Sequence, residues 1–245
     1  MKIIAVVQAR MESTRLPGKV LMDIEGKTML SRVIERVRQA KKVDDVVVAT
    51  TDRSADTVVV EACHQLGVVV FRGDMEDVLD RYYRAVKQHQ AQVVVRITAD
   101  CPLIDPDIID QIITVFLENK VDYASNTMTR SYPRGLDVEV FSTAALERAW
   151  READQQHQRE HVTPYFYQNP KQFKLKAVTY ADDFSHFRWT VDTEEDLALI
   201  QAIYRRLPAA HLATWQEIVA FIYRESDLLT INNHIQQKSL PQVNG

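Results

Sequence analysis

A short stretch near the amino terminus concentrates basic side chains among small and polar residues. Arg10, Arg15 and Lys19 lie close together, and Gly18 stands directly before the lysine. A guanidinium group pairs with two phosphate oxygens at once, an ammonium adds a point charge, and glycine permits close backbone approach. Such a loop is suited to hold a triphosphate and to neutralise the charge on departing pyrophosphate. A solvated basic turn would have the same composition, so both interpretations stay open here.

Two aspartates further along the chain follow strand-like apolar runs. Asp100 comes after Val93–Ile97, and Asp192 comes directly after Phe187–Val191. A carboxylate at the end of a strand is well placed to bind Mg²⁺, which takes a few carboxylates together with water and substrate phosphates. Each aspartate also has a structural alternative. Asp100 would cap or turn the chain, and Asp192 would be a helix N-cap with Glu195 at the capping-box position.

Two other motifs are interpreted as structural. Gly26–Thr28 imitates the end of a P-loop, but Leu21 stands where that motif needs glycine, so Thr28 is expected to cap a helix. Asp105–Asp107 has the form of a glycosyltransferase metal site. Aspartate and then proline before an apolar helical run are typical of an N-cap and the first helical position, and we predict that role instead.

The elements that must position these residues alternate over the first half of the chain. Apolar runs predict buried strands at Ile3–Val7, Val46–Ala49, Val68–Phe71 and Val93–Ile97. Helical spacing predicts helices at residues 30–37, 58–66, 78–89 and 108–117. The alternation predicts an α/β fold with a doubly wound, mostly parallel sheet. Ligands of such sheets bind at the carboxyl ends of the strands, where the basic loop and Asp100 fall.

The pattern is less regular after about Tyr123. It predicts a strand with one exposed face at Asp137–Phe141, a return to the sheet at Phe187–Val191, and helices at residues 143–153, 197–207 and 215–223. We expect a single domain over residues 1–230, in which residues of about 128–178 form a small lobe or a subunit interface. Residues 231–245 are expected to be a polar, poorly ordered tail.

Composition excludes several classes of protein. The chain of 245 residues is 46% hydrophobic and 26% charged, which is ordinary for a folded globular protein. Its net charge of −4 opposes nucleic acid and anionic membranes as partners, so an anionic ligand needs a local basic cluster. The first apolar run is too short for a signal peptide or a membrane span, and a cytoplasmic location is expected. Cys63 and Cys101 are too few for a disulfide framework, and Cys101 is interpreted as a packing residue rather than a nucleophile paired with His161.

The basic loop and the two loops that carry Asp100 and Asp192 together resemble those of the cytidylyltransferase family that makes CMP-activated acidic sugars. The family includes CMP-3-deoxy-manno-octulosonate (KDO) synthetases, CMP-sialic acid synthetases and the spore coat polysaccharide biosynthesis protein F group. The resemblance extends from Lys2 to about Leu207. The motif similar to the CTP-binding loop of KDO synthetases is Ala9-Arg10-x-x-Ser13-Thr14-Arg15-Leu16-Pro17-Gly18-Lys19. The motifs that match the family's two metal sites are Asp100-x-Pro102-Leu103 and Val191-Asp192-Thr193-x-Glu195-Asp196-Leu197.

The resemblance implies a Rossmann-like nucleotidyltransferase with a small lobe for the acceptor and for dimerisation, Mg²⁺ as cofactor, and CTP and an acidic sugar as partners of a homodimer. The residues implied to be catalytic are Arg15, Lys19, Asp100 and Asp192, the last two as Mg²⁺ ligands. The residues implied to bind CTP are Ala9, Arg10, Ser13, Arg15, Lys19 and Thr98. The residues implied to line the acceptor site are Arg72, Arg134, Asp137, Glu139, Arg159 and His161, the last within a Glu160-His161 pair similar to one in these enzymes.

The spore coat group resembles this chain in four further stretches. They are Phe71–Gly73, Asp77–Tyr83, Pro133–Glu139 and Arg159–Tyr165. Three arginines in these stretches, Arg72, Arg134 and Arg159, are candidates to pair with the acceptor's carboxylate, and we expect one or two of them to do so. Two departures from the family pattern, Gln8 in place of proline and Thr98-Ala99 in place of Gln-Gly, leave the sugar and the base preference open.

The implied reaction is an in-line displacement by a sugar hydroxyl at the α-phosphate of CTP, for surface polysaccharide biosynthesis. Two alternatives are a nucleotide-sugar-dependent glycosyltransferase and a non-catalytic nucleotide-binding domain. The basic loop argues against the first, because such an enzyme releases no pyrophosphate. The intact Arg15, Lys19, Asp100 and Asp192 argue against the second.

Overall fold

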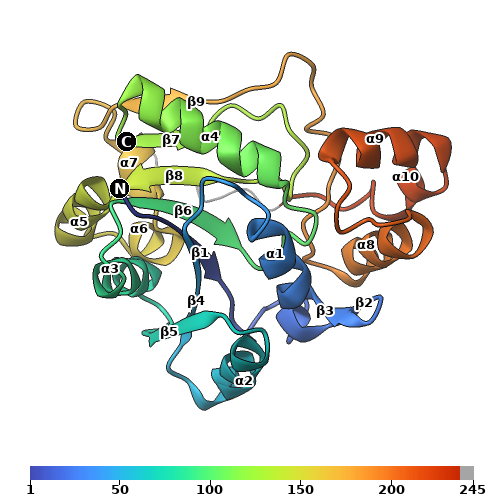
Figure 1. Ribbon diagram of the computed structural model, residues 1–245, viewed down its shortest axis with the longest axis horizontal. Coiled ribbons are helices and arrows are strands. Elements are labelled where there is room, and N and C mark those ends of the chain that lie inside the picture. Colours follow the sequence, from blue (N-terminus) through green and yellow to red (C-terminus); the bar gives the residue numbers. More distant parts are fainter. Residues whose placement is uncertain (238–245) are drawn as a thin grey trace.

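Valine- and isoleucine-rich segments build the centre of a seven-stranded sheet. In the computed structural model, which describes residues 1–237, the strand order is β5-β4-β1-β6-β8-β7-β9 (Figure 1). The strands are β1 Ile3–Gln8, β4 Asp45–Thr51, β5 Val69–Gly73, β6 Val93–Thr98, β7 Tyr123–Ser125, β8 Glu139–Ser142 and β9 Leu175–Ala177. All pairs are parallel except those that β8 makes with β6 and β7. The predicted doubly wound, mostly parallel sheet is thus confirmed.

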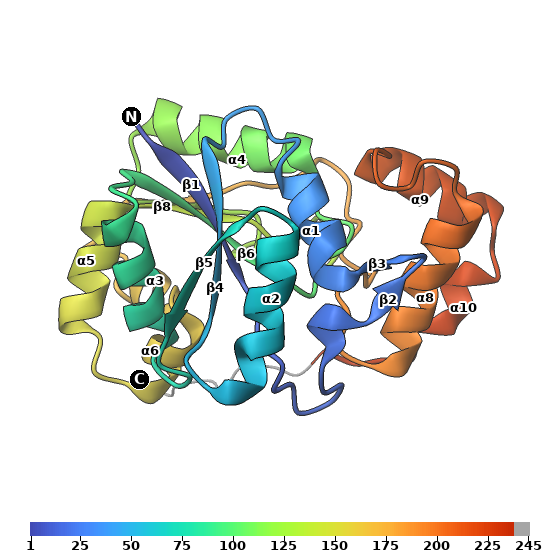
Figure 2. The same cartoon turned by 60° about the horizontal axis from the view of Figure 1, so that its bottom comes forward.

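Helices cover both faces of this sheet, as Figure 2 shows. On one face lie α1 Met29–Val37, α2 Thr57–Gln65 and α4 Pro106–Asn119. On the other lie α3 Val78–Gln88, α5 Thr143–Glu152, α6 Gln156–His161 and α7 Pro164–Gln168. Successive residues of β1 point to opposite faces, so Ala5 and Val7 join the first core while Ile4 and Val6 join the second. The continuous apolar run thus correctly predicted a strand that is buried on both faces of the sheet.

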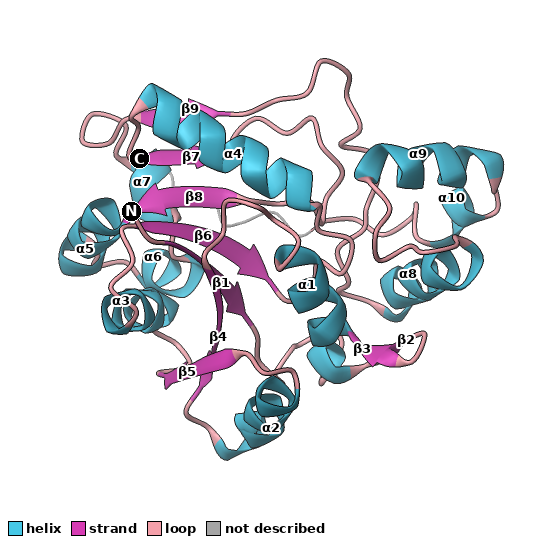
Figure 3. Cartoon of the chain, in the orientation of Figure 1, coloured by secondary structure: helices cyan, strands magenta, loops and turns pink. Residues whose placement is uncertain are grey.

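The remaining elements lie beside the sheet (Figure 3). They are the hairpin of β2 Asp23–Ile24 and β3 Lys27–Thr28, the 3₁₀ turns Lys19–Leu21 and Ser54–Asp56, and the helices α8 Glu194–Arg206, α9 Trp215–Arg224 and α10 Leu228–Ile231. Thr28 caps α1 as predicted, because its hydroxyl accepts a hydrogen bond from the Ser31 amide at 3.2 Å. Asp105 caps α4 and accepts from the Asp107 amide at 2.8 Å, with proline in the first turn.

The prediction of an exposed face on the strand at 137–141 is wrong. Strand β8 lies inside the sheet between β6 and β7, and Glu139, Val140 and Phe141 are all buried. Alternation arose here because Glu139 is a buried charge. It pairs with Arg96 and accepts a hydrogen bond from the Tyr123 hydroxyl at 2.5 Å.

Two further expectations need correction. Phe187–Val191 does not return to the sheet as a strand, since among residues 1–237 it makes a single bridge, between Arg134 and Arg188. The tail does not begin at residue 231 as a loose segment, because Asn232 is 5% exposed and hydrogen-bonded. Residues 238–245, which complete the predicted tail, lie outside the described residues.

The stretch of residues 128–178 supplies β8 and β9 to the same sheet as β1 and packs α5 and α7 against the second core.

Within residues 1–237, no helix combines the length and apolar character needed to cross a bilayer.

Candidate active site

The basic loop after β1 is folded against the sheet by backbone and side-chain contacts. The Gly18 amide donates to the Met11 carbonyl at 2.8 Å, and the Met11 amide donates to the buried carboxylate of Asp56 at 2.7 Å. Gly18 has a φ of +72°, a left-handed conformation that glycine adopts without strain. Directly after it, Lys19 begins a 3₁₀ turn and points inward, with 8% of its surface exposed.

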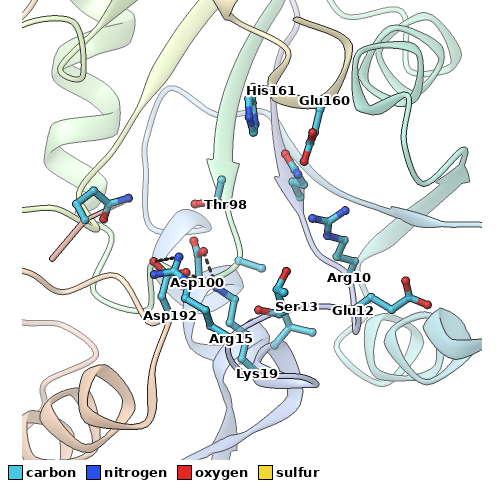
Figure 4. Close-up of a pocket in the computed structure, with 15 residues that line it drawn as sticks. Arg10, Glu12, Ser13, Arg15, Lys19, Thr98, Asp100, Glu160, His161 and Asp192 are labelled. Carbon is cyan, nitrogen blue, oxygen red and sulfur yellow. Dashed lines mark hydrogen bonds and ion pairs between the residues drawn. The ribbon is translucent and has the colours of Figure 1, made fainter. Parts of the chain in front are cut away.

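Lys19 joins the two aspartates that the sequence singled out. Its Nζ lies 2.8 Å from Asp100 Oδ2 and 2.9 Å from Asp192 Oδ1, and it donates to the Val191 carbonyl at 2.7 Å. The second oxygen of Asp192 lies 2.9 Å from Arg15 Nη2 (Figure 4). Residues from three separate loops thus meet at the carboxyl edge of the sheet, as expected for a doubly wound fold.

The loop that carries Asp192 is held by its neighbours. The Val191 amide donates to the Asp100 carbonyl at 2.8 Å, and the Trp189 amide donates to the Arg134 carbonyl at 2.7 Å. Arg188 donates to Asp192 Oδ2 at 2.9 Å. The alternative role of Asp192 as the cap of α8 is excluded, because Thr193 is the N-cap. Asp196, rather than Glu195, completes the capping box.

Lys19 and Asp100 remain ionised in each other's presence. Burial alone lowers the pKa of Lys19, but the carboxylates of Asp100 and Asp192 outweigh burial and raise it. Burial raises the pKa of Asp100, yet the Lys19 ammonium dominates and leaves it at about 2. Asp100 is therefore a carboxylate at neutral pH. Burial and the adjacent carboxylate of Asp100 raise the pKa of the Cys101 thiol well above its ordinary value, so Cys101 stays protonated and packs in the core, as predicted.

The two aspartates have the chemistry of a site for a hard divalent cation. Asp100 Oδ2 and Asp192 Oδ1 both contact the Lys19 ammonium. The two carboxylate oxygens are therefore close enough together to contact a single positive charge. In the part of the chain that the structure describes, no cluster of three or more histidine, cysteine or acidic side chains suited to a metal is present. Two carboxylates fit Mg²⁺, which completes its shell with water and substrate phosphates.

A cavity of about 450 Å³ opens over this cluster. Of the residues predicted to bind CTP or to act in catalysis, it is lined by Arg10, Ser13, Arg15, Lys19, Thr98, Asp100 and Asp192. Figure 4 shows Glu160 and His161 on the side of this cavity opposite Lys19 and Ser13. Ala9 does not line the cavity, because it is buried in the core and its amide donates to Ala49 at 3.1 Å.

The backbone turns sharply behind His161. Val162 has φ 71° and ψ −55°, and the Thr163 amide donates to the His161 carbonyl at 2.8 Å. This three-residue turn is strained for a β-branched residue, and the full burial of Val162 holds it in place. Burial lowers the pKa of His161, so its imidazole is uncharged at neutral pH.

A second cavity of about 490 Å³ adjoins the first and shares Thr98, His161 and Gln237 with it. Its charged lining residues are Arg96, Arg130, Arg134, Asp137 and Glu139. Two of these arginines are neutralised. Arg96 pairs with Glu139, and Arg130 makes a bidentate pair with Asp137 at 2.6 and 3.0 Å.

Arg134 is the arginine of this cavity that no acidic side chain of the described residues neutralises. It is half-buried, and its backbone, rather than its guanidinium, makes the contacts to Phe187 and Trp189. Burial and then the positive charge of Arg130 lower the pKa of the Arg134 guanidinium. The second cavity thus has one guanidinium available for an anion.

The other two arginines proposed from the sequence do not line either cavity. Arg72 donates to the carbonyls of Thr51 and Arg53 at 3.0 and 2.8 Å. Arg159 pairs with Asp77, the N-cap of α3, at 2.5 Å. Both arginines fasten loops and lie outside the two cavities, so their contact with substrate stays a prediction. Of the three, Arg134 is the one that lines a cavity among the described residues.

Sequence reasoning missed Arg96, Arg130, Arg188 and Gln237. A signal was present for Arg96, because a charge inside the valine run of β6 has to meet a partner or a ligand. A similar signal was present for Arg188, because it lies inside the apolar run that contains Trp189. In the structure Arg188 is 7% exposed. Arg130 and Gln237 had no local signal, since their place depends on where distant segments fold.

Comparisons with known proteins agree with this geometry. The family model described as cytidylyltransferase matches residues 4–229. The spore coat polysaccharide biosynthesis protein SpsF of Bacillus subtilis is 32% identical over 235 residues, covering 93% of this chain and 97% of that protein. A 3-deoxy-manno-octulosonate cytidylyltransferase of Trichlorobacter lovleyi is 38% identical over 121 residues, covering 49% of this chain and 46% of that one.

Among solved structures, a cytidylyltransferase from Leptospira borgpetersenii superposes with a TM-score of 0.89 at 33% identity, covering 98% of this chain and 99% of that one. An α/β fold with a basic loop facing two carboxylates is the architecture of a nucleotidyltransferase. The chain belongs to the cytidylyltransferase family and is a CTP-dependent enzyme of that class.

Proposed function

We propose that the protein transfers CMP from CTP to an acidic sugar and releases pyrophosphate, as a step of surface polysaccharide biosynthesis. The observation that carries the proposal is the pair of adjoining cavities. One is lined by the basic loop and the two aspartates, and the other contains a single uncompensated arginine among the described residues. The name of SpsF supports a step of polysaccharide biosynthesis, and the name of the KDO cytidylyltransferase supports transfer of CMP to an acidic sugar.

The triphosphate binds in the first cavity. Arg10, Arg15 and Lys19 line it and supply positive charge where the β- and γ-phosphates leave. Arg15 is held in place by Asp192 before substrate arrives, so this side chain needs little reorganisation.

Asp100 and Asp192 hold Mg²⁺ in this proposal. The bound ion supplies charge neutralisation and Lewis-acid polarisation at the phosphates. With a cation on these two carboxylates, the Lys19 ammonium, which now pairs with them, would be free to pair with the triphosphate through its flexible stem. The carboxyl group of Asp100 is already ionised, so no proton has to leave it.

The acceptor binds in the second cavity, with its carboxylate on Arg134. Its reacting hydroxyl faces the boundary formed by Thr98 and His161, which line both cavities. The uncharged imidazole of His161 offers a ring nitrogen that accepts a hydrogen bond from this hydroxyl. The attacking oxygen is thereby directed toward the α-phosphate.

Pyrophosphate release tests the proposal. The four nucleoside triphosphates are each supplied with Mg²⁺ and a panel of acidic sugars, and pyrophosphate is measured. Release that requires both CTP and one sugar is the expected result. Measurable CTP binding without release for any sugar of the panel would contradict the proposal and favour an enzyme that uses a finished nucleotide sugar.

Arg134→Ala is expected to raise the KM for the acidic acceptor about 10- to 100-fold, because a hydrogen-bonded charge pair contributes roughly 1.5–3 kcal/mol. The KM for CTP should change less than about twofold, since Arg134 does not line the first cavity. Arg151→Ala, at an exposed position, is the matched control. An acceptor analogue with its carboxylate reduced to an alcohol should lose this difference between Arg134→Ala and the unchanged enzyme. Equal acceptor KM values in both enzymes with the intact acceptor would refute the role of Arg134.

A further inference from the structure

The last described residues turn back toward the active site. After α10, Asn232 is buried, and five residues later Gln237 lines both the nucleotide cavity and the acceptor cavity. The intervening residues 233–236 carry no acidic or arginine side chain. The segment of residues 232–237 thus places the amide side chain of Gln237 at the boundary between the two cavities.

The segment is anchored at its start. Asn232 Nδ2 donates to the Arg188 carbonyl and to Asp196 Oδ1, both at 2.9 Å. The Ile235 amide donates to the Asn232 carbonyl at 3.0 Å. Ile235 is half-buried and lines a small cavity together with Phe187. These contacts attach the segment to the same loop that carries Asp192.

Arg188 fixes the direction of the Gln237 amide. Its Nη1 donates to Gln237 Oε1, while its Nη2 donates to Asp192 Oδ2 at 2.9 Å. A guanidinium only donates hydrogen bonds, so the oxygen of the amide must face Arg188 and the nitrogen must face away. Gln237 is exposed, and among residues 1–237 the hydrogen bond found for its side chain is the one from Arg188 to Oε1, so Nε2 donates to none of these residues. Its two N–H groups are available to a ligand.

We propose that Gln237 contacts the acceptor, with Nε2 donating a hydrogen bond to an oxygen of the sugar at the boundary of the two cavities. The phosphates already have Arg10, Arg15 and Lys19, and the acceptor's carboxylate has Arg134. A neutral donor at the boundary is suited to a hydroxyl or ring oxygen, which carries no charge. Gln237 thereby becomes a specificity-determining residue that the carboxyl-terminal segment contributes. This inference rests on the proposed function.

Two substitutions separate a contact with substrate from a structural role. Gln237→Glu keeps an oxygen that accepts from Arg188, but it removes the N–H donors and adds a negative charge. Gln237→Ala removes both the acceptor and the donors. If Gln237 serves only to hold Arg188, the glutamate variant keeps that contact, and the effect of its charge falls on CTP and on the acidic acceptor alike. If it donates to the acceptor, glutamate is at least as harmful as alanine.

The measurements are the KM for the acceptor, kcat, and the Kd for CTP by titration calorimetry. We expect Gln237→Ala to raise the acceptor KM roughly three- to tenfold, the range for one hydrogen bond, and Gln237→Glu to raise it at least as much. The Kd for CTP should stay within about twofold in Gln237→Ala, whereas the added charge of Gln237→Glu is expected to weaken CTP binding as well, because residue 237 lines the nucleotide cavity. Gln236→Ala, at the adjacent exposed glutamine that lines neither cavity, should leave every value unchanged.

Three results would overturn the inference: a Gln237→Glu enzyme equal to the unchanged one, a Gln237→Ala enzyme equal to Gln236→Ala, or a change in CTP affinity in place of acceptor KM. The unchanged enzyme, assayed beside them, identifies which proposal has failed. If it releases pyrophosphate with CTP and a sugar while the variants match it, only the role of Gln237 is lost. If it releases none with any acceptor, the proposed function and this inference fall together.

Discussion

Replacing Asp192 by asparagine is expected to reduce turnover by roughly a thousandfold or more while CTP still binds. The asparagine would keep the shape of the side chain, but it would offer the cation a neutral oxygen in place of a carboxylate. Loss of one anionic ligand removes several kcal/mol of transition-state stabilisation, and about 1.4 kcal/mol corresponds to a factor of ten in rate. Binding of CTP without Mg²⁺ should be equal or tighter, because the charges of Arg15, Lys19 and Arg188 would no longer be compensated by Asp192.

Pyrophosphate release measured over a range of Mg²⁺ concentrations tests this expectation, with CTP affinity measured in parallel. Asp182→Asn makes the same chemical change at an exposed position and serves as the control. The half-saturating Mg²⁺ concentration should rise in Asp192→Asn only. Full activity in that variant would rule out Asp192 as a metal ligand.

The parts of the site that the sequence predicted are those set by neighbouring residues. The basic loop follows β1 directly, and Asp100 follows β6, so the rule that ligands bind at the carboxyl ends of parallel strands placed Lys19 and Asp100 at the same edge, while their roles came from the family resemblance. The caps at Thr28 and Asp105 were predicted for the same reason, because a cap depends on the next three residues.

The parts that it did not predict depend on distant partners. Arg72, Arg134 and Arg159 have the same side chain, and the sequence offered each as a carboxylate ligand. Arg159 is not available to a ligand in the way that Arg134 is, because it pairs with Asp77, 82 positions away. Arg72 is held by the end of β4, since it donates to the Thr51 carbonyl. The position of Gln237 likewise depends on Asn232, which reaches Asp196 across 36 positions. No local pattern encodes such pairings, since they follow from how the loops pack.

The close approach of two backbone segments beside the site leads to the other large expected effect. Gly135 has a φ of +101°, and a Cβ placed there would lie 2.6 Å from the Trp189 carbonyl carbon and 2.7 Å from the Thr190 amide nitrogen. These are backbone atoms that cannot rotate away. The segment they belong to leads directly to Asp192. Gly135→Ala must therefore push this segment outward or strain the turn after Arg134.

We expect Gly135→Ala to lower the free energy of unfolding by about 3 kcal/mol or more, the size of effect seen for combined overpacking and backbone strain. Urea unfolding measures it, and kcat measures whether Asp192 has moved. Gly26→Ala is the matched control, because Gly26 also has a positive φ, +80°, but a Cβ placed there would meet no atom within 4 Å. It should cost only about 1–2 kcal/mol, the penalty of the left-handed backbone, with kcat unchanged. The difference between the two variants isolates the contact with Trp189 and Thr190. An equal decrease in the free energy of unfolding in both variants would show that the Trp189–Thr190 segment shifts without cost, and that this contact does not position Asp192.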